Sequence, residues 1–271
     1  MRWVRFEQHG QRSVGYLADG TVQPVAAASL QDVMAGNGVQ PAGDPVALTA
    51  ATLVAPLRPG KVIAVGLNYM DHCREQNVKP PEKPILFPKF PTSVIGPQQS
   101  IHWPPDFSSQ VDYEAELAVV IGKVTRGVSE ENALEHVFGY TNANDVSARD
   151  VQFSDGQWLR GKASDTFCPL GPAIVTRDEV PDPQALPIKC RVNGTTLQDS
   201  NTKEMIFPVR FLLSFISRAI TLEPGDVILT GTPHGVGVFR DPKVFLTPGD
   251  RVDVEIGDFG ILTNPIGPAG V

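Results

Sequence analysis

The sequence is poor in cysteine and has no excess of basic residues. Its three cysteines, Cys73, Cys168 and Cys190, lie far apart and form no C-x-x-C pair. This argues against a disulfide framework and a thiolate zinc site, and it favours a reducing compartment. Lys and Arg number 23 against 30 Asp and Glu, giving a net charge of -7, so a nucleic-acid partner is not expected.

Long apolar runs are also missing. No stretch approaches the roughly 20 apolar residues of a membrane span, and charges interrupt the beginning of the chain too early for an export signal. We therefore expect a cytoplasmic protein without a membrane partner. Its default ligand is a small molecule, and an anionic ligand would need a local cation or a metal ion to bind against the overall negative charge.

The composition is otherwise that of a folded globular protein. Hydrophobic residues make up 41% and charged residues 20% of the 271 positions, and this length lies between one large domain and two ordinary ones. The 25 glycines and 25 prolines favour many short strands joined by turns. Turn and strand signals at the start predict a small N-terminal α+β domain over residues 1–55.

Periodicity and capping residues predict the main elements. Helices are expected from Ser29, which opens the first, to Gly36, which ends it, and over residues 69–76, 129–138 and 208–220. Ser129 would cap the third of these, and Gly139 would end it. Strands are expected over residues 62–65, 114–121, 226–232 and 251–256.

Two carboxylates precede an apolar run in a way that indicates a metal site. Side chains two apart on a strand share a face, so Glu114 and Glu116 point the same way. Asp145 follows the next predicted element and can return to the sheet beside them. Three oxygen ligands suit Mg²⁺ or Mn²⁺ better than zinc. Each residue also has a simpler explanation. Glu114 and Glu116 could form an exposed acidic edge of a strand, and Asp145 could be a turn or cap residue.

Three other segments contain residues that could take part in chemistry or ligand binding. Residues 156–163 nearly match a phosphate-binding loop, but Ala163 replaces the required hydroxyl residue and no apolar strand precedes the segment. Lys162 remains either a cation near Asp145 or an ordinary surface lysine. His72 and Glu75 are three apart on a helical turn, where they form either a competent base or an exposed polar pair. The glycines of 231–237 do not form a dinucleotide fingerprint, and no G-x-S-x-G hydrolase motif is present.

Taken together, five ordered motifs resemble the fumarylacetoacetate hydrolase family over roughly residues 55 to 266. They are VGLNY at 65–69, DH at 71–72, EAEL at 114–117, DVSARD at 145–150 and GTPHGVG at 231–237. The segments 71–77 and 165–172 are most similar to the branch called fumarylacetoacetate hydrolase domain-containing protein 2, which is associated with oxaloacetate tautomerisation.

The resemblance implies an α+β, β-rich fold in which a mixed β-sheet roll at 56–271 forms the catalytic domain, and it implies a homodimer. It also implies a Mg²⁺ or Mn²⁺ cofactor, with Ca²⁺ allowed in crystals. The residues to which the family's roles carry over are the metal ligands Glu114, Glu116 and Asp145, the catalytic group Lys162, the lid pair His72 and Glu75, and the substrate-binding residues Arg149, Gln152 and Thr232.

The expected activity acts on a 2-oxo acid or β-dicarbonyl compound through a metal-bound enolate. The branch favours keto–enol tautomerisation or isomerisation, with oxaloacetate or a hydroxymuconate as substrate. The same enolate also serves an acylpyruvate hydrolase or an oxaloacetate decarboxylase, so these reactions remain alternatives. A catalytically silent metal-binding protein is the alternative from another class.

Overall fold

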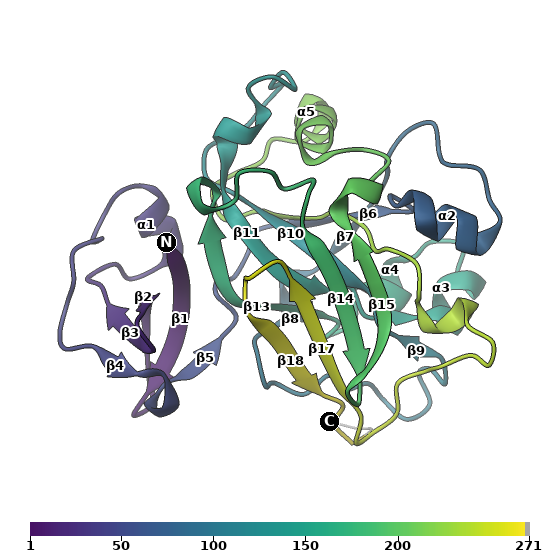
Figure 1. Ribbon diagram of the computed structural model, residues 1–271, viewed down its shortest axis with the longest axis horizontal. Helices are drawn as coiled ribbons and strands as arrows, with labels where there is room; N and C mark the ends of the chain where they lie inside the picture. The colour runs from purple at the N-terminus through teal and green to yellow at the C-terminus, as the bar shows by residue number, and fades with distance from the viewer. Residues whose placement is uncertain (269–271) are drawn as a thin grey trace.

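The computed structural model describes residues 1–268. Its strands form a twelve-stranded mixed sheet, a four-stranded antiparallel sheet and a two-stranded ribbon. Figure 1 shows a small N-terminal unit beside a larger β-rich body, with few and short helices around it. The α+β, β-rich class expected from the sequence is therefore confirmed.

The N-terminal unit is a meander of short strands with one helix. Ser29 caps that helix as expected, because its side chain accepts a hydrogen bond from the Asp32 backbone N–H. The unit is joined to the body by pairing of β1 with β13 of the large sheet. Its elements are β1 (Arg2–Gln8), β2 (Gln11–Ala18), β3 (Thr21–Pro24), α1 (Leu30–Met34), β4 (Val46–Ala47) and β5 (Thr52–Val54).

The larger body contains the remaining elements. Its helices are α2 (Met70–Gln76), α3 (Arg149–Ser154), α4 (Leu159–Lys162) and α5 (Val209–Ala219). Its strands in the large sheet and the ribbon are β6 (Val62–Gly66), β7 (Ile85–Lys89), β8 (Val94–Ile95), β9 (Val111–Asp112), β10 (Ala115–Ile121), β11 (Val137–Asn144), β12 (Ser147–Ala148), β13 (Cys168–Thr176) and β16 (Val227–Leu229). The four-stranded sheet consists of β14 (Pro187–Val192), β15 (Thr195–Asn201), β17 (Arg251–Ile256) and β18 (Ile261–Pro265).

Strand β10 runs through the middle of the molecule and is buried along its whole length. Leu117 and Val119 on one face belong to the core that contains side chains of the four-stranded sheet. Ala118 and Val120 on the other face belong to a separate core. A strand covered on both faces needs a continuous apolar sequence, which explains the run that follows Glu116.

The prediction of a helix over residues 129–138 is wrong. Only a short 3₁₀ turn is present at Ala133–His136, and β11 begins at Val137. Pairing of β11 with β10 satisfies its backbone groups and overrides the local helical signals. Gly139 does not end a helix but lies within β11, where an added Cβ would come 2.3 Å from the Val175 carbonyl oxygen.

The other predicted helices are present, whereas α3 and α4 were not predicted. The expected helix over 208–220 is α5, and the helical turn over 69–76 contains α2. Both cover the body at its edges in Figure 1. No helix within the described residues has the length and apolarity needed to cross a membrane.

Candidate metal centre and active site

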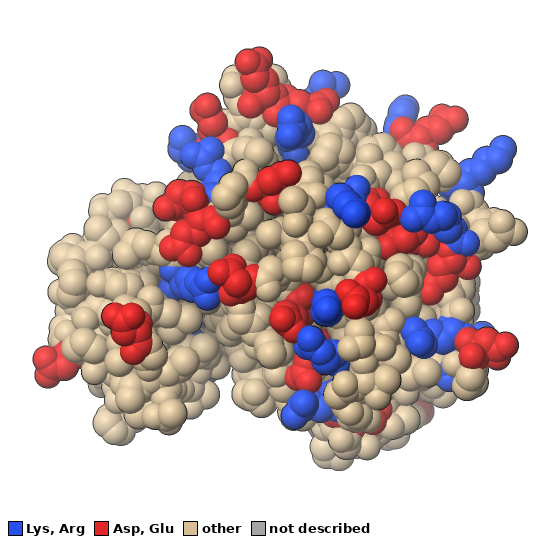
Figure 2. Space-filling model, in the orientation of Figure 1, with Lys and Arg blue, Asp and Glu red and all other residues tan. Residues whose placement is uncertain are grey.

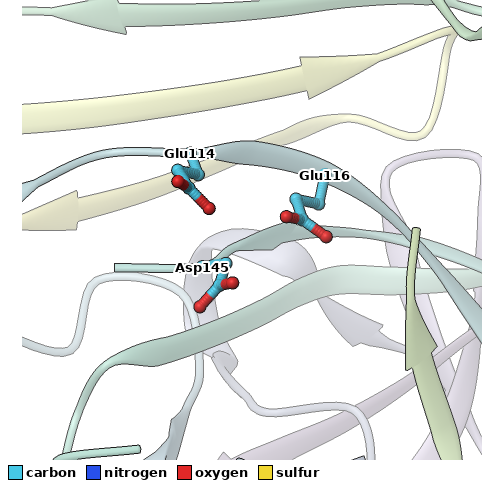
Figure 3. A group of neighbouring side chains, drawn as sticks. All are labelled: Glu114, Glu116 and Asp145. Carbon is cyan, nitrogen blue, oxygen red and sulfur yellow. The ribbon is translucent and has the colours of Figure 1, made fainter. Parts of the chain in front are cut away.

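Three buried carboxylates converge at the end of β10. One carboxylate oxygen from each of Glu114, Glu116 and Asp145 lies within 4.8 Å of the others, and the three residues are at most 5% exposed. Figure 3 shows the carboxylates pointing toward a common space, with Asp145 opposite the two glutamates. Asp145 reaches this position because β11, which it follows, pairs antiparallel with β10. The simpler explanation of an exposed acidic edge is therefore excluded.

Two cations bind Glu114 directly. Lys162 Nζ donates to Glu114 Oε2 at 2.6 Å and to Asp145 Oδ2 at 2.9 Å, and Arg149 Nη2 lies 2.7 Å from Glu114 Oε1. Burial acts to raise the pKa of Glu114, but Lys162 and Arg149 outweigh it and lower this pKa to about 2. Glu114 is therefore ionised at neutral pH. Lys162 is not a surface lysine, since it is only 3% exposed.

Glu116 has no such partner among the described residues. Its Oε2 accepts one hydrogen bond, from the Gly231 backbone N–H at 2.8 Å, and it forms no ion pair there. Burial, and then the negative charges of Asp145 and Glu114, raise the pKa of Glu116 well above its ordinary value. A divalent cation between the three carboxylates would remove this repulsion, and an all-oxygen donor set suits Mg²⁺, Mn²⁺ or Ca²⁺. The residues present therefore fit the expected metal.

Sequence reasoning missed two charged residues of this site. Lys89 is buried at the end of β7 and pairs with Asp145 Oδ1, and Asp112 accepts from Arg149 Nε at 2.8 Å. Strand periodicity could have indicated that both side chains are buried near the site. Lys89 shares a strand face with the buried Phe87, and Asp112 stands two residues before Glu114.

The pair on α2 is formed as the spacing predicted. His72 Nδ1 lies 2.7 Å from Glu75 Oε2, and His72 Nε2 lies 2.7 Å from Gln76 Nε2. A carboxylate accepts only, so Nδ1 is assigned the proton, and Nε2 then carries the lone pair that accepts from Gln76. His72 is 6% exposed, which rules out a solvated pair. With the proton on Nδ1, the neutral ring can take up a proton at Nε2, the atom that accepts from Gln76.

The glycine-containing loop at 231–237 holds the acidic residues in place. Gly235 N–H donates to Glu75 Oε1 at 2.8 Å, and Gly237 N–H donates to Asp112 Oδ1 at 2.7 Å, while Gly231 binds Glu116 as described. Gly231 and Gly235 have φ of +91° and +99°, a region that disfavours other residues. A Cβ on Gly237 would meet the Val244 carbonyl oxygen at 1.7 Å. The loop thus supplies backbone donors to carboxylates.

All of the sequence-predicted site residues except Glu75 line one cavity of about 160 Å³. Glu75 lies behind His72 and contacts the cavity through it. The walls are apolar around Phe87 and Trp158, whose rings meet edge to face at 5.3 Å. Arg149 is held by Asp112, Glu114 and Gln152. The predicted residues that line the cavity are His72, Glu114, Glu116, Asp145, Arg149, Gln152, Lys162 and Thr232.

Two family models match the chain. Residues 61–267 match the model described as fumarylacetoacetate (FAA) hydrolase C-terminal. Residues 1–56 match the model described as Rv2993c-like, N-terminal. The first of these covers most of the chain and includes every residue of the carboxylate site.

Relatives agree with this assignment. The chain is 54% identical over 218 residues to "Oxaloacetate tautomerase fahd2, mitochondrial" of Xenopus laevis, covering 79% of this chain and 68% of that protein. Among solved structures, fumarylacetoacetate hydrolase from Exiguobacterium antarcticum is 43% identical with a TM-score of 0.88, covering 98% of this chain and 99% of that one. A 5-carboxymethyl-2-hydroxymuconate delta-isomerase from Mycobacterium smegmatis is 39% identical with a TM-score of 0.87, over 100% of both chains. This chain belongs to the fumarylacetoacetate hydrolase family.

Proposed function

We propose that this protein is a divalent-metal-dependent keto–enol tautomerase acting on oxaloacetate or a related 2-oxo dicarboxylate. The observation that carries the proposal is the convergence of a buried carboxylate triad, an ammonium group and an aligned imidazole on one cavity. At about 160 Å³ the cavity lies below the roughly 300–1,000 Å³ of pockets for drug-sized ligands. It therefore suits a small substrate.

Charge balance supports both the metal and the anionic substrate. Four buried carboxylates face three buried cations, which leaves one negative charge in excess. A bound divalent cation would supply positive charge opposite the oxygens of a 2-oxo acid and so reduce the cost of charge that develops there. These seven groups and the divalent cation would then carry a single positive charge, which favours an anionic substrate; Glu75, which lies behind His72, is not counted among them. The carboxylates are Asp112, Glu114, Glu116 and Asp145, and the cations are Lys89, Arg149 and Lys162.

Lys162 is proposed to stabilise charge on the substrate. An ammonium group has three donors, and Glu114 and Asp145 use two of them. The third can donate to the 2-oxo or enol oxygen as negative charge grows on it. Because both carboxylates hold Nζ in place, little reorganisation accompanies the reaction.

His72 is proposed to move the proton at C3 of the substrate. Its Nε2 faces Gln76 and the cavity, and Glu75 would stabilise the imidazolium that forms when Nε2 takes up a proton. Gln76 must turn away before substrate can meet Nε2. We propose that α2 acts as the lid that makes this exchange, since polar side-chain contacts, which can break and form again, hold it to the rest of the protein. These contacts include Asp71 with Ser200, Arg74 with Glu204, and Glu75 with the Gly235 N–H.

Two of the three relatives described above favour a reaction that breaks no carbon–carbon bond, whereas the third is named a fumarylacetoacetate hydrolase. A relative more than half identical is named an oxaloacetate tautomerase, and a structural neighbour over the full chain is named a hydroxymuconate isomerase. Hydroxymuconate isomerisation is therefore the second candidate function. Hydrolysis of an acylpyruvate and decarboxylation of oxaloacetate remain alternatives that the same residues could serve, and a silent metal-binding protein remains the alternative without catalysis.

A substrate panel separates these reactions. Oxaloacetate enol, an acylpyruvate and a carboxymethyl-hydroxymuconate are incubated with the protein and Mg²⁺ or Mn²⁺, and loss of enol absorbance is followed beside product analysis. The proposal requires ketonisation of oxaloacetate as the fastest reaction. A faster release of pyruvate from the acylpyruvate would assign a hydrolase instead, and tight metal binding without any turnover would assign a binding protein.

Three further proposals concern the domain division, the oligomeric state and the cellular location. We propose a division of the chain near residue 55, a homodimer, and a cytoplasmic location. Several relatives carry the word mitochondrial in their names, so the location needs a direct measurement by fractionation or imaging.

A further inference from the structure

A second cavity lies between the N-terminal unit and the larger body, away from the carboxylate site. It has a volume of about 280 Å³ and shares no residue with the catalytic cavity. Its ionisable lining residues are three arginines, Arg5 of β1, Arg12 of β2 and Arg58 of the segment after β5. We call it the arginine groove. Its full lining is Arg5, Arg12, Val54, Ala55, Leu57, Arg58, Pro91, Thr92, Val94 and Gln99.

The positive charge in the groove is poorly compensated. Arg12 pairs with Glu7 at 3.2 Å, where the arginine side chain is 63% exposed and the glutamate side chain 38%. Within residues 1–268, neither Arg5 nor Arg58 has a carboxylate within 4.0 Å; Arg5 Nη1 donates only to the Ala55 carbonyl oxygen at 3.3 Å. Three guanidinium groups therefore face one carboxylate, in a protein whose net charge is -7.

This arrangement differs from the rest of the surface. On the face shown in Figure 2, basic and acidic side chains are interspersed over the larger body. In the groove, burial and then the charges of Arg12 and Arg58 lower the pKa of Arg5. Like charges held together in a partly enclosed space are stabilised by a counter-ion, by the same reasoning that applies to the carboxylate triad.

Neutral donors stand beside the arginines. Gln99 lines the groove; its Oε1 accepts from the Gly96 N–H at 2.5 Å, which leaves its side-chain NH₂ free to donate to a ligand. Thr92 adds a hydroxyl group. Planar guanidinium groups bind carboxylate and phosphoryl oxygens in pairs, and amide and hydroxyl donors complete such sites.

We propose that the arginine groove binds a small oxyanion with at least two negative charges, either a phosphoryl compound or a polycarboxylate. Arg58 and Arg12 contact its oxygens from the open side, and Arg5 forms the floor. The site is independent of the proposed catalytic function, because none of its residues lies in the catalytic cavity.

The test uses inorganic phosphate and citrate as probes. Binding to the full-length, metal-free protein is measured by calorimetry at constant ionic strength set with KCl. Without metal the catalytic carboxylates repel anions, so a signal reports the groove. We expect saturable binding with one site per chain, and at least tenfold weaker binding in Arg58→Gln.

A matched control removes the same charge elsewhere. Arg210 is exposed on α5 and forms no ion pair among the described residues, so Arg210→Gln should bind the probes as the parent does. Arg12→Gln gives a second test in the groove, and it should also weaken binding. Binding of phosphate but not citrate assigns a phosphoryl ligand, and the reverse assigns a polycarboxylate. Failure of both to saturate, or equal weakening in Arg58→Gln and Arg210→Gln, would overturn the proposal.

Discussion

Replacing Glu116 by Gln should stabilise the metal-free protein and weaken its stabilisation by Mg²⁺. The amide is similar in shape and can keep an oxygen toward the Gly231 N–H, but it removes one of three buried negative charges. At the 4.8 Å upper limit of ligand-atom separation, each carboxylate pair repels by about 3.5 kcal/mol at an effective dielectric constant near 20. Protonation of Glu116 limits this cost, so we expect a net gain of about 1–2 kcal/mol.

The assay is thermal unfolding in EDTA and in Mg²⁺. A gain of this size corresponds to a melting temperature higher by roughly 2–8 °C in EDTA. Mg²⁺ at about 100 times its Kd would stabilise the parent by roughly 2.7 kcal/mol, whereas the variant should respond little. The order of the two melting temperatures should therefore reverse when Mg²⁺ is added.

The pH dependence has a definite sign. The pKa of Glu116 is raised in the folded protein, so its destabilising effect develops as pH rises above the ordinary carboxyl range and is absent in acid. The advantage of Glu116→Gln in EDTA should therefore shrink as pH falls. A variant that is less stable than the parent in EDTA, and gains as much from Mg²⁺, would refute the assignment of Glu116.

Four further substitutions test the other groups. Lys162→Met should lower turnover by about a hundredfold, which is the usual effect of losing an electrostatic stabiliser. Mg²⁺ binding measured by calorimetry should not weaken, because the substitution removes a competing cation from the ligand oxygens. Full activity of this variant would exclude Lys162 from the reaction. His72→Ala and Glu75→Ala should each slow turnover by on the order of a hundredfold, with the double variant little slower than the poorer single one, and losses that multiply would mean that the two act independently. Lys89→Met removes the buried ammonium group that pairs with Asp145 Oδ1. It should lower the free energy of unfolding in EDTA, measured by urea denaturation, by about 3–5 kcal/mol. An unchanged unfolding midpoint would show that Lys89 does not compensate the charge of Asp145.

The shared orientation of Glu114 and Glu116 could be predicted from the sequence because it depends on local strand geometry. Glu114 and Glu116 are two apart beside a strand, and Asp145 follows the strand that pairs with it. Strand periodicity placed the two glutamates on one face but left an exposed acidic edge open. The family resemblance assigned Asp145 to the same site, and the pairing of β10 with β11 that brings it there was not predicted. The pair on α2 was predictable for the same reason, since residues three apart on a helix meet.

The contacts that sequence reasoning missed depend on long-range pairing. Lys89 meets Asp145 across 56 positions of sequence, because β7 and β11 reach the site from distant parts of the large sheet. Residues 129–138 begin with a helix cap signal, but from Val137 the chain continues as β11 between β10 and β13. Local sequence patterns do not indicate which distant strands become neighbours. The burial of Lys89 and the start of β11 at Val137 could therefore be established only from the structure.

The central claim is that the protein moves a proton on a 2-oxo acid without breaking a carbon–carbon bond. The most direct measurement follows enol-oxaloacetate by NMR in the presence of Mg²⁺, with the parent protein and with His72→Ala as the control. We predict that the parent converts enol to keto form much faster than the control does, with the carbon skeleton intact. Formation of pyruvate and carbon dioxide at a matching rate, or equal rates for the two proteins, would contradict this account.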